Sequence, residues 1–514
     1  MNNQSKPFEI IATINENLLD KSILSSMIHK GATFFRLNGA FLGAERVEHS
    51  VKKIRQLVGN NIKILLDLPG YKIRFLYLKQ DIQFNEHTPF TIEKHYLNYP
   101  GVFDVFKIGT IIRINDGMDR LKVIELHNDR LICIGHRKGI IRRGKGLHLD
   151  SISYRPSTHS LSDFDIQLLQ EAKHHGIDYV GLSFIYNLED IAFIQSHLSE
   201  SGIKMLPKIE SKESVMNLID VLSASEEFII DRGDLAGEIG LENIWKTQRE
   251  IIACCRALDK KIYVATQALS YMVSHPLPSI AEIDSLYALL KHGINGVQLS
   301  EETVQGQYAL AAIHEVRHAF NQCTHQDLSS LFQKCGKVIW IMGPTGSGKT
   351  TIAKEFVKRC QRLGNVMHYD GDEIRNLFPS DHGFSKHDRL YVVKALVNMA
   401  KKAADSGCIV VVSALTAYED ARTYIREQIK DLIIVHIDCS IETCMKRDYK
   451  GLYQKAINGE INTLVGINTP YIPPDQSIVT ISVNSEQLLP SDASKMIMHH
   501  LLKHEIQLNG NWSI

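Results

Sequence analysis

The chain has 514 residues, of which 44% are hydrophobic and 23% are charged. Single hydrophobic cores stop growing near about 250–300 residues, so this length predicts about three domains. Lys and Arg together number 58, as do Asp and Glu, and this balance excludes the basic excess of a protein that wraps nucleic acid. No apolar run reaches the roughly 20 residues of a membrane span, and the nine cysteines form no CxxC pair, which predicts a cytoplasmic protein with reduced thiols.

Short β-branched runs and amphipathic segments alternate over about the first 320 residues. The amphipathic segments, such as Asp165–His175 and Trp245–Leu258, carry apolar residues every three or four positions, which predicts helices. The β-branched runs lie at Glu9–Ile14, Thr33–Asn38, Lys63–Leu68, Tyr179–Phe184, Lys204–Glu210, Glu227–Asp234, Lys261–Gln267 and Gly296–Thr303. Strands that alternate with helices in this way predict an α/β fold, a (β/α)₈ barrel whose active-site face is formed by the C-terminal ends of the strands.

A different pattern interrupts this alternation. Alternating apolar residues in Thr110–Ile114 and Leu121–Ile134 flank the turn signal Asn115-Asp116-Gly117, and they predict a small inserted β-domain. A polar stretch near residue 321 predicts a linker, and a second α/β pattern follows it. The predicted domains are a barrel at 1–74 and 150–320, an inserted β-domain at 75–149, a linker at 321–336 and a P-loop α/β domain at 337–514.

An apolar strand at Val338–Met342 runs into a glycine-rich loop of the pattern GxxxxGK[ST]. The glycines let backbone N–H groups approach phosphate oxygens, and the helix after the loop adds positive potential. Lys349 reaches the β- and γ-phosphates, where it acts in catalysis, and the Thr350 hydroxyl ligates Mg²⁺. The predicted ATP-binding residues of the loop are Gly343, Thr345, Gly346, Ser347, Gly348, Lys349, Thr350 and Thr351.

Further strings follow this loop in the chain. They are Tyr369–Arg375, Gly383–Arg389, Arg447–Tyr453 and Gly466–Tyr471, and they include the patterns DGDxIR, GFSxxDR and RDxKGLY. Together with the loop they make residues 337–476 resemble adenylylsulfate kinase. The resemblance implies a P-loop kinase that uses ATP and Mg²⁺ to phosphorylate the 3′-hydroxyl of adenylylsulfate or a related nucleotide.

The resemblance also implies roles for single residues. Asp370 would lie near the acceptor hydroxyl as its base or orienter, and Arg447 would lie near the ATP base. Phe384 would stack on the acceptor's nucleobase, while Arg375 and Arg389 would hold its anionic bridge, because planar guanidinium groups suit phosphate oxygens. The implied acceptor-binding residues are Asp372, Arg375, Phe384, Arg389, Ser413, Lys450, Leu452 and Ile467.

Three positions depart from that family. Val392 stands where the family has Asn, Ser413–Ala417 replaces a string that ends in Ser-Pro, and Asn468 replaces an acidic residue. These changes fall on the acceptor side and leave the ATP side intact. The acceptor is therefore adenylylsulfate or another nucleoside diphosphate-like anion, such as a cytidine diphosphoramidate.

The first part of the chain carries its own ordered set of strings at the predicted strand ends. They are Ile10–Ile14, Arg36–Asn38, Leu66-Asp67, Ile73-Arg74, Asn115–Gly117, Ser183–Ile185, Lys208–Glu210, Arg232–Leu235, Ala265–Gln267 and Leu299–Thr303. In this order they make residues 8–318 resemble pyruvate kinase, with the inserted β-domain in the place of that family's mobile lid.

This second resemblance implies a phosphoenolpyruvate site with a divalent metal. Glu210 and Asp234 would be the metal ligands, since carboxylate oxygens suit octahedral Mg²⁺. Lys208 would neutralise the phosphoryl group in flight, and Thr266 would lie close to the enolate carbon. The implied phosphoenolpyruvate-binding residues are Arg36, Arg74, Lys208, Gly233, Asp234 and Thr266, and the further implied metal ligands are Asn38 and Asp67.

The barrel, too, departs from its family. Asn38-Gly39-Ala40-Phe41-Leu42 replaces a string that supplies a serine ligand of a monovalent cation, so a requirement for K⁺ is left open. Three interpretations remain: a phosphoenolpyruvate-dependent enzyme, altered chemistry on a similar oxoacid, and an inactive barrel that senses a ligand. For the whole chain we expect nucleotides, phosphoenolpyruvate and pyruvate as small-molecule partners, a homo-oligomer, no nucleic acid and no membrane.

Overall fold

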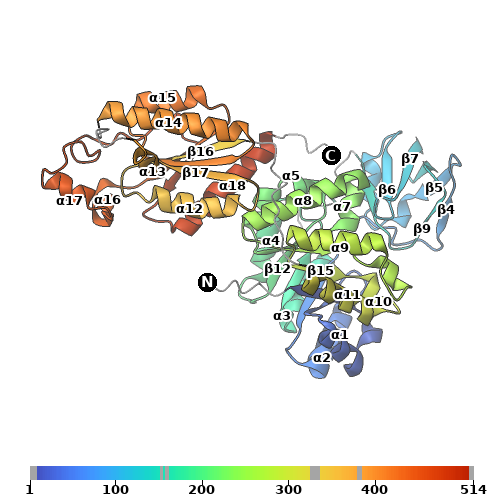
Figure 1. The fold of residues 1–514 in the computed structure, drawn as a ribbon. Coiled ribbons are helices and arrows are strands. Elements are labelled where there is room, and N and C mark those ends of the chain that lie inside the picture. Colours follow the sequence, from blue (N-terminus) through green and yellow to red (C-terminus); the bar gives the residue numbers. More distant parts are fainter. Residues whose placement is uncertain (1–7, 151–153, 157–160, 324–335, 379–384, 509–514) are drawn as a thin grey trace. The chain divides into compact units, whose positions relative to one another are not determined.

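A computed structural model describes residues 8–150, 154–156, 161–323, 336–378 and 385–508. The chain divides into two compact units, one before residue 326 and one after it, and each is described by itself (Figure 1). Within the described ranges no helix is long and apolar enough to cross a membrane. The cysteines in these ranges are free thiols.

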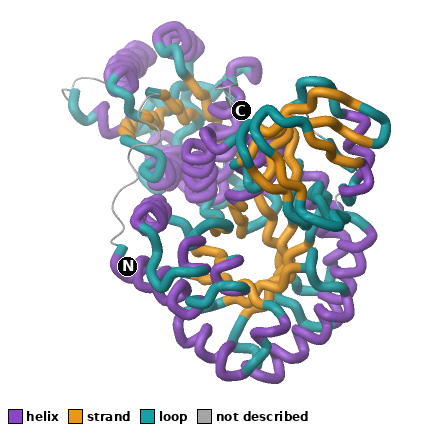
Figure 2. Tube along the Cα trace, turned by 90° about the vertical axis from the view of Figure 1, so that its right-hand side faces the viewer, coloured by secondary structure: helices purple, strands orange, loops and turns teal. Residues whose placement is uncertain are grey.

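The first unit is built on a closed barrel of parallel strands. Its order is β1-β2-β3-β11-β12-β13-β14-β15, and β15 closes on β1. The strands are β1 (Glu9–Ile14), β2 (Phe34–Asn38), β3 (Lys63–Leu68), β11 (Tyr179–Leu182), β12 (Lys204–Ile209), β13 (Glu227–Asp231), β14 (Lys261–Ala265) and β15 (Gly296–Leu299). Figure 2 shows helices outside this ring of strands. The prediction of a (β/α)₈ barrel is confirmed.

The barrel helices begin and end where the sequence supplies caps. The Asp20 carboxylate accepts hydrogen bonds from the first turn of α1, and Ser162 and Ser279 form capping boxes on α3 and α9, which satisfy backbone donors that have no helical partner. The helices are α1 (Lys21–Lys30), α2 (Ala44–Val58), α3 (Asp163–His174), α4 (Leu188–Leu198), α5 (Lys212–Met216), α6 (Leu218–Ser223), α7 (Arg232–Ile239), α8 (Leu241–Ala257), α9 (Ile280–His292), α10 (Glu301–Val304) and α11 (Ala309–Gln322), with short 3₁₀ turns at Glu16–Leu18 and Ser270–Val273.

Several of the predicted strand runs are too long at their C-terminal ends. The run predicted at Glu227–Asp234 stops as a strand at Asp231, and the run predicted at Gly296–Thr303 stops at Leu299. Helix α7 begins directly after the first of these strands, and α10 begins two residues after the end of the second. Asp234 therefore lies in the first turn of α7 rather than on a strand end, which is a position that favours a carboxylate.

The strands between Ile82 and Leu149 form the inserted β-region, which has a hydrophobic core of its own. Its main sheet is antiparallel with the order β10-β6-β7-β8-β5, and β4 pairs with β9. Asn115 and Asp116 have φ values of 52° and 57°, as a primed hairpin turn requires. The predicted alternating run Leu121–Ile134 is two strands. The elements are β4 (Ile82–Phe84), β5 (Phe90–Glu93), β6 (Ile111–Ile114), β7 (Asp119–Leu126), β8 (Arg130–Gly135), β9 (Gly139–Ile141) and β10 (Leu147–Leu149), with 3₁₀ turns at Lys94–Tyr96 and Pro100–Val105.

The second unit is a parallel sheet with the order β17-β18-β16-β19-β20. Helices α14 and α15 pack on one face, around the buried Trp340, and α12 and α18 lie on the other (Figure 1). The elements are β16 (Lys337–Met342), α12 (Lys349–Cys360), β17 (Val366–Asp370), α13 (Gly371–Arg375), α14 (Lys386–Asp405), β18 (Ile409–Ala414), α15 (Glu419–Gln428), β19 (Leu432–Asp438), α16 (Ile441–Arg447), α17 (Leu452–Ile457), β20 (Ile481–Asn484) and α18 (Pro490–Leu508), with a 3₁₀ turn at Gln476–Ile478. The predicted P-loop α/β fold is confirmed.

Candidate functional site

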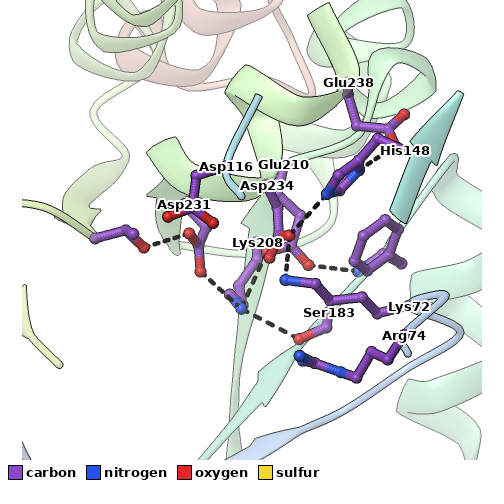
Figure 3. A network of polar contacts seen from close by, with 12 residues as sticks. Lys72, Arg74, Asp116, His148, Ser183, Lys208, Glu210, Asp231, Asp234 and Glu238 are labelled. Atoms are coloured by element: carbon purple, nitrogen blue, oxygen red, sulfur yellow. Dashed lines mark hydrogen bonds and ion pairs between the residues drawn. The ribbon is translucent and has the colours of Figure 1, made fainter. Parts of the chain in front are cut away.

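Lys208 lies at the centre of the polar cluster at the C-terminal end of the barrel (Figure 3). Its ammonium nitrogen Nζ is 3.0 Å from an oxygen of Glu210, 3.0 Å from one of Asp231 and 3.6 Å from one of Asp67. Burial by itself lowers the pKa of Lys208, but these carboxylates outweigh it and hold the pKa well above its ordinary value. Lys208 is therefore a permanent buried cation, suited to binding an anionic ligand.

Asp234 is neutralised by two cations from the ends of the inserted β-region. Lys72 forms an ion pair with Oδ1 of Asp234, and Nε2 of His148 lies 3.3 Å from the same oxygen (Figure 3). The other ring nitrogen of His148 lies 2.8 Å from Glu238. Burial lowers the pKa of His148, yet Asp234 and Glu238 raise it to about 9, so the ring is protonated at neutral pH. A Cβ at Gly237 would come within 2.3 Å of this ring, so only glycine permits the contact.

The carboxylates of the cluster differ in their protonation. Burial, together with the charges of Asp234 and Asp231, raises the pKa of Glu210 to about 7. Burial also favours the neutral form of Asp67, but Lys208 and Arg36 outweigh it and lower its pKa. Arg36 donates to Asp67 from Nε at 3.0 Å. At neutral pH this cluster is close to charge-balanced, since Lys208, Arg36, Lys72 and His148 face Asp67, Glu210, Asp231 and Asp234.

Asp231 and Thr266 are joined by a hydrogen bond from the Thr266 hydroxyl to the Asp231 carboxylate. Thr266 has a φ of 69°, a left-handed conformation that is strained for a β-branched residue. Arg232 holds the strained turn by donating to the Thr266 carbonyl at 3.1 and 2.9 Å. A Cβ at Gly233 would come within 2.8 Å of the Thr266 methyl group. The turn that presents Thr266 is thus fixed from two sides.

The remaining predicted barrel residues have other contacts. Arg74 donates to the Gly144 carbonyl at 3.0 Å, and its charge lowers the pKa of Asp67. The side-chain oxygen of Asn38 accepts from the backbone N–H of Ala40 at 3.1 Å, so it stabilises its own turn. Neither contact by itself identifies a ligand.

The barrel's donor set fits a divalent cation of the Mg²⁺ type. Glu210, Asp231 and Asp234 each offer an oxygen, and these oxygens lie within 4.8 Å of one another. Carboxylate oxygens are the ligands that Mg²⁺ prefers. Lys208 and Lys72 already neutralise these oxygens, so a bound cation would have to compete with them.

The glycine-rich loop of the second unit opens into a cleft of about 540 Å³. Gly343 and Ile467 are not among the described residues that line it, and Phe384 lies outside the described residues. The other predicted nucleotide-site residues line the cleft, namely Thr345, Gly346, Ser347, Gly348, Lys349, Thr350, Thr351, Asp370, Asp372, Arg375, Arg389, Ser413, Arg447, Lys450 and Leu452. The buried Val392 lines it as well.

Asp370 acts as a hydrogen-bond acceptor in this cleft. The hydroxyl groups of Thr350 and Ser413 both donate to its Oδ2 at 2.7 Å, and the backbone N–H of Asp372 donates to its Oδ1 at 2.9 Å. Burial favours the protonated form, but these donors lower the pKa of Asp370. An ionised carboxylate that already accepts three hydrogen bonds is a better orienter than a base.

Burial disfavours the charged form of the cations of the cleft. Burial lowers the pKa of Lys349 to about 8, and its Nζ donates to the Pro344 carbonyl at 2.7 Å. Burial also lowers the pKa of Arg375 and of Arg389, and the charge of Arg375 lowers that of Arg389 further. Cations that disfavour one another's charge are stabilised by an anion between them.

Two further predicted residues lie at the rim of the cleft. Lys450 forms an ion pair with Asp372 at 2.6 Å. Arg447 donates to the Ser485 carbonyl at 2.8 Å, which holds its guanidinium group beside the loop. The Thr350 hydroxyl and the neighbouring carboxylates are hard oxygen donors of the kind that Mg²⁺ takes with nucleotide phosphates, so the residues fit that ion.

The sequence reasoning missed Lys72, His148, Asp231 and Glu238 in the barrel, and His368 in the second unit. Lys72 alternates with Arg74, and His148 stands between Leu147 and Leu149, so strand periodicity could have placed both on a polar face. Asp231 directly precedes the string Arg232–Leu235. His368 carries no signal beyond its place two residues before Asp370 on the same strand.

Family models match both units. The model for the pyruvate kinase barrel domain matches residues 5–313, and the model for adenylylsulphate kinase matches residues 335–482. Both are families of phosphotransferases. The adenylylsulphate kinase match covers the glycine-rich loop and the cleft residues up to β20.

Curated relatives match the barrel. Pyruvate kinase of Staphylococcus saprophyticus is 27% identical over 352 residues, which are 64% of this chain and 59% of the relative. That of Dictyostelium discoideum is 29% identical over 59% of this chain and 64% of its own length. That of Thermotoga maritima is 26% identical over 67% and 81%. The chain thus spans less than two thirds of the first two relatives. By its barrel the chain belongs to the pyruvate kinase family, and the same chain carries an adenylylsulfate kinase domain.

Proposed function

We propose that the second unit is an ATP-dependent kinase that phosphorylates the 3′-hydroxyl of adenylylsulfate or of a related nucleotide with an anionic bridge. The observation that carries this proposal is the convergence of Lys349, Arg375 and Arg389 on one cleft with pKa values lowered by burial. Phosphoryl transfer needs positioning and charge neutralisation more than covalent chemistry. Such a cleft supplies both.

Each side of the cleft has a separate task in this proposal. Lys349 neutralises the transferring phosphoryl group, and Thr350, oriented by Asp370, contributes to the site of Mg²⁺, which when bound neutralises phosphate charge. Arg375 and Arg389 hold the anionic bridge of the acceptor. The buried Val392 offers that acceptor an apolar surface, so its base is held there by contact rather than by hydrogen bonds.

The test is a screen of acceptors with γ-labelled ATP and the full chain. Adenylylsulfate, other nucleoside phosphosulfates and nucleoside diphosphoramidates such as cytidine diphosphoramidate are the candidates, and Lys349→Ala is the control for residual activity. Label transfer to one acceptor class supports the proposal and names the substrate. Transfer to none of them, with ATP bound normally, argues against a nucleotide kinase.

We also propose that the barrel binds phosphoenolpyruvate or a similar oxoacid with Mg²⁺, and that it regenerates ATP from ADP in the same chain as an ATP-consuming site. The observation that favours this second function is the buried Lys208 among Glu210, Asp231 and Asp234. In the reaction the phosphoryl group would pass to ADP, while Lys208 offsets charge on the oxoacid.

Pyruvate formation from phosphoenolpyruvate and ADP tests the barrel, with and without K⁺, in the wild type and in Asp234→Ala. Turnover that does not respond to K⁺ is expected, because Lys72 already supplies a positive charge at Asp234. Metal-dependent ligand binding without turnover would instead favour the ligand-sensing barrel, in which the barrel regulates the kinase without chemistry.

A further inference from the structure

His368 stands behind the catalytic cleft and is connected to it by hydrogen bonds. It lies on β17 two residues before Asp370, so the two side chains share one face of the sheet. On the neighbouring strand Ser413 is the register partner of Asp370, which brings its hydroxyl between the two. His368 is not among the residues that line the cleft.

The contacts form one series of hydrogen bonds that ends at the nucleotide site. Nε2 of His368 lies 3.0 Å from the Ser413 hydroxyl, which lies 2.7 Å from Oδ2 of Asp370. The Thr350 hydroxyl lies 2.7 Å from the same Oδ2. This series of hydrogen bonds thus links the half-buried imidazole of His368 to Thr350, the first residue after Lys349.

The number of available protons determines which group donates in each of these hydrogen bonds. Ser413 has one hydroxyl proton, and the ionised Asp370 can only accept, so Ser413 donates to Asp370. Its oxygen then accepts from His368, whose Nε2 must carry the hydrogen. Thr350 likewise donates to Asp370, which leaves the lone pairs of its oxygen for a metal or phosphate neighbour. Burial lowers the pKa of His368, and the neutral ring has one N–H, which this contact uses.

We infer that His368 is a positioning residue for the phosphoryl transfer: through Ser413 it fixes the Asp370 carboxylate that orients Thr350. The inference rests on the kinase function proposed above and deepens it. Without His368 the Ser413 hydroxyl keeps its proton but loses the N–H that His368 offers it. It can then turn away from Asp370, and the carboxylate can rotate with it.

The test compares two substitutions in the full chain. His368→Leu removes the donor, and His368→Gln retains an N–H at similar reach. His436→Leu is the matched control, because His436 is a buried histidine of the same sheet, on β19, and its Nε2 contacts Tyr471 instead. We expect His368→Leu to lower kcat about 10- to 100-fold and to raise KM for ATP in the presence of Mg²⁺ about tenfold. His368→Gln should stay within about threefold of the wild type.

Two results would overturn the inference. One is equal loss in the Leu and Gln variants, and the other is a loss in His368→Leu that His436→Leu reproduces, since both would indicate a structural role.

Mg²⁺-dependent ATP binding, measured by calorimetry with and without Mg²⁺, separates this inference from the proposed function. If no acceptor is phosphorylated by the wild type, His368→Leu should still lose about tenfold of the Mg²⁺-dependent gain in ATP affinity, and an unchanged gain overturns the inference.

Discussion

The barrel cluster and the P-loop cleft both gather cations for an anionic ligand, but they hold those cations differently. In the barrel, Lys208 contacts three carboxylates and its pKa is raised. In the cleft, burial lowers the pKa of Lys349, Arg375 and Arg389. The barrel cations are thus stabilised before any ligand arrives, whereas those of the cleft gain from the ligand's charge.

This difference predicts two modes of binding. A ligand of the barrel must exchange protein ion pairs for its own, so the free energy of binding is a difference between similar electrostatic terms. In the cleft, burial disfavours the charge of each cation and the negative charge of a ligand offsets that cost, so each cation there should contribute to affinity or rate. The predictions below test this contrast, from the largest expected effect to the smallest.

The substitution Lys349→Ala should abolish ATP-dependent phosphoryl transfer while the fold survives. A buried ammonium that meets the transferring phosphates supplies charge stabilisation of about 100-fold or more. Initial rates with γ-labelled ATP at saturating ATP measure the effect, and circular dichroism confirms the fold. A residual rate above about a tenth of the wild type would contradict this role.

Arg389→Ala should weaken acceptor binding about 10- to 100-fold and ATP binding much less, because guanidinium groups bind anionic oxygens in charge-assisted hydrogen bonds. Calorimetry with each ligand in turn measures the two affinities. Arg426→Ala, at an exposed arginine on α15, is the matched control. Equal losses for both ligands would mean that Arg389 supports the structure of the cleft.

Lys72→Met should tighten Mg²⁺ binding to the barrel by about tenfold, or about 1.4 kcal/mol. The substitution removes the ammonium that competes for Oδ1 of Asp234, and the uncompensated carboxylate then favours a cation. The Mg²⁺ affinity is measured by calorimetric titration. Both proteins also carry Lys349→Ala, which limits the signal from the cleft. Lys79→Met, at an exposed lysine, serves as the control, and weaker binding in Lys72→Met would refute the competition.

Raising the pH from about 8 to 9 should destabilise the first unit by about 1 kcal/mol through His148. Its folded-state pKa of about 9 lies above the ordinary value of 6.5. The stability that this shift contributes is therefore complete below pH 6.5 and is lost as the pH rises through 9. Urea unfolding at several pH values measures it, and His148→Gln should flatten the slope. An unchanged slope in that variant would assign the dependence to other groups.

Much of both sites could be predicted from the sequence. The glycine-rich loop has fixed spacing, and the local backbone that it requires places Lys349 and Thr350 without knowledge of the rest of the fold. Lys208 and Glu210 follow from strand periodicity, because the ends of parallel strands meet at one rim of a barrel.

The ion pairs of the barrel could not be predicted in this way. Lys72 and His148 are separated by the whole inserted β-region, and they meet at Asp234 only because that region leaves and rejoins the barrel at one place. The run predicted through Asp234 ended too late for a related reason, since the switch from strand to helix after Asp231 depends on packing rather than on local alternation. His368 shows the same limit, because its partner Ser413 comes from another strand.

The two connections of the inserted β-region share one carboxylate of the barrel. Lys72 precedes the region and His148 closes it, and both contact Asp234, while His148 also contacts Glu238. A cation that binds Asp234 would therefore weaken a contact of both connections at the same time. We expect amide exchange in β10 to accelerate when a cation binds, so that occupancy of the barrel and opening of the region are coupled.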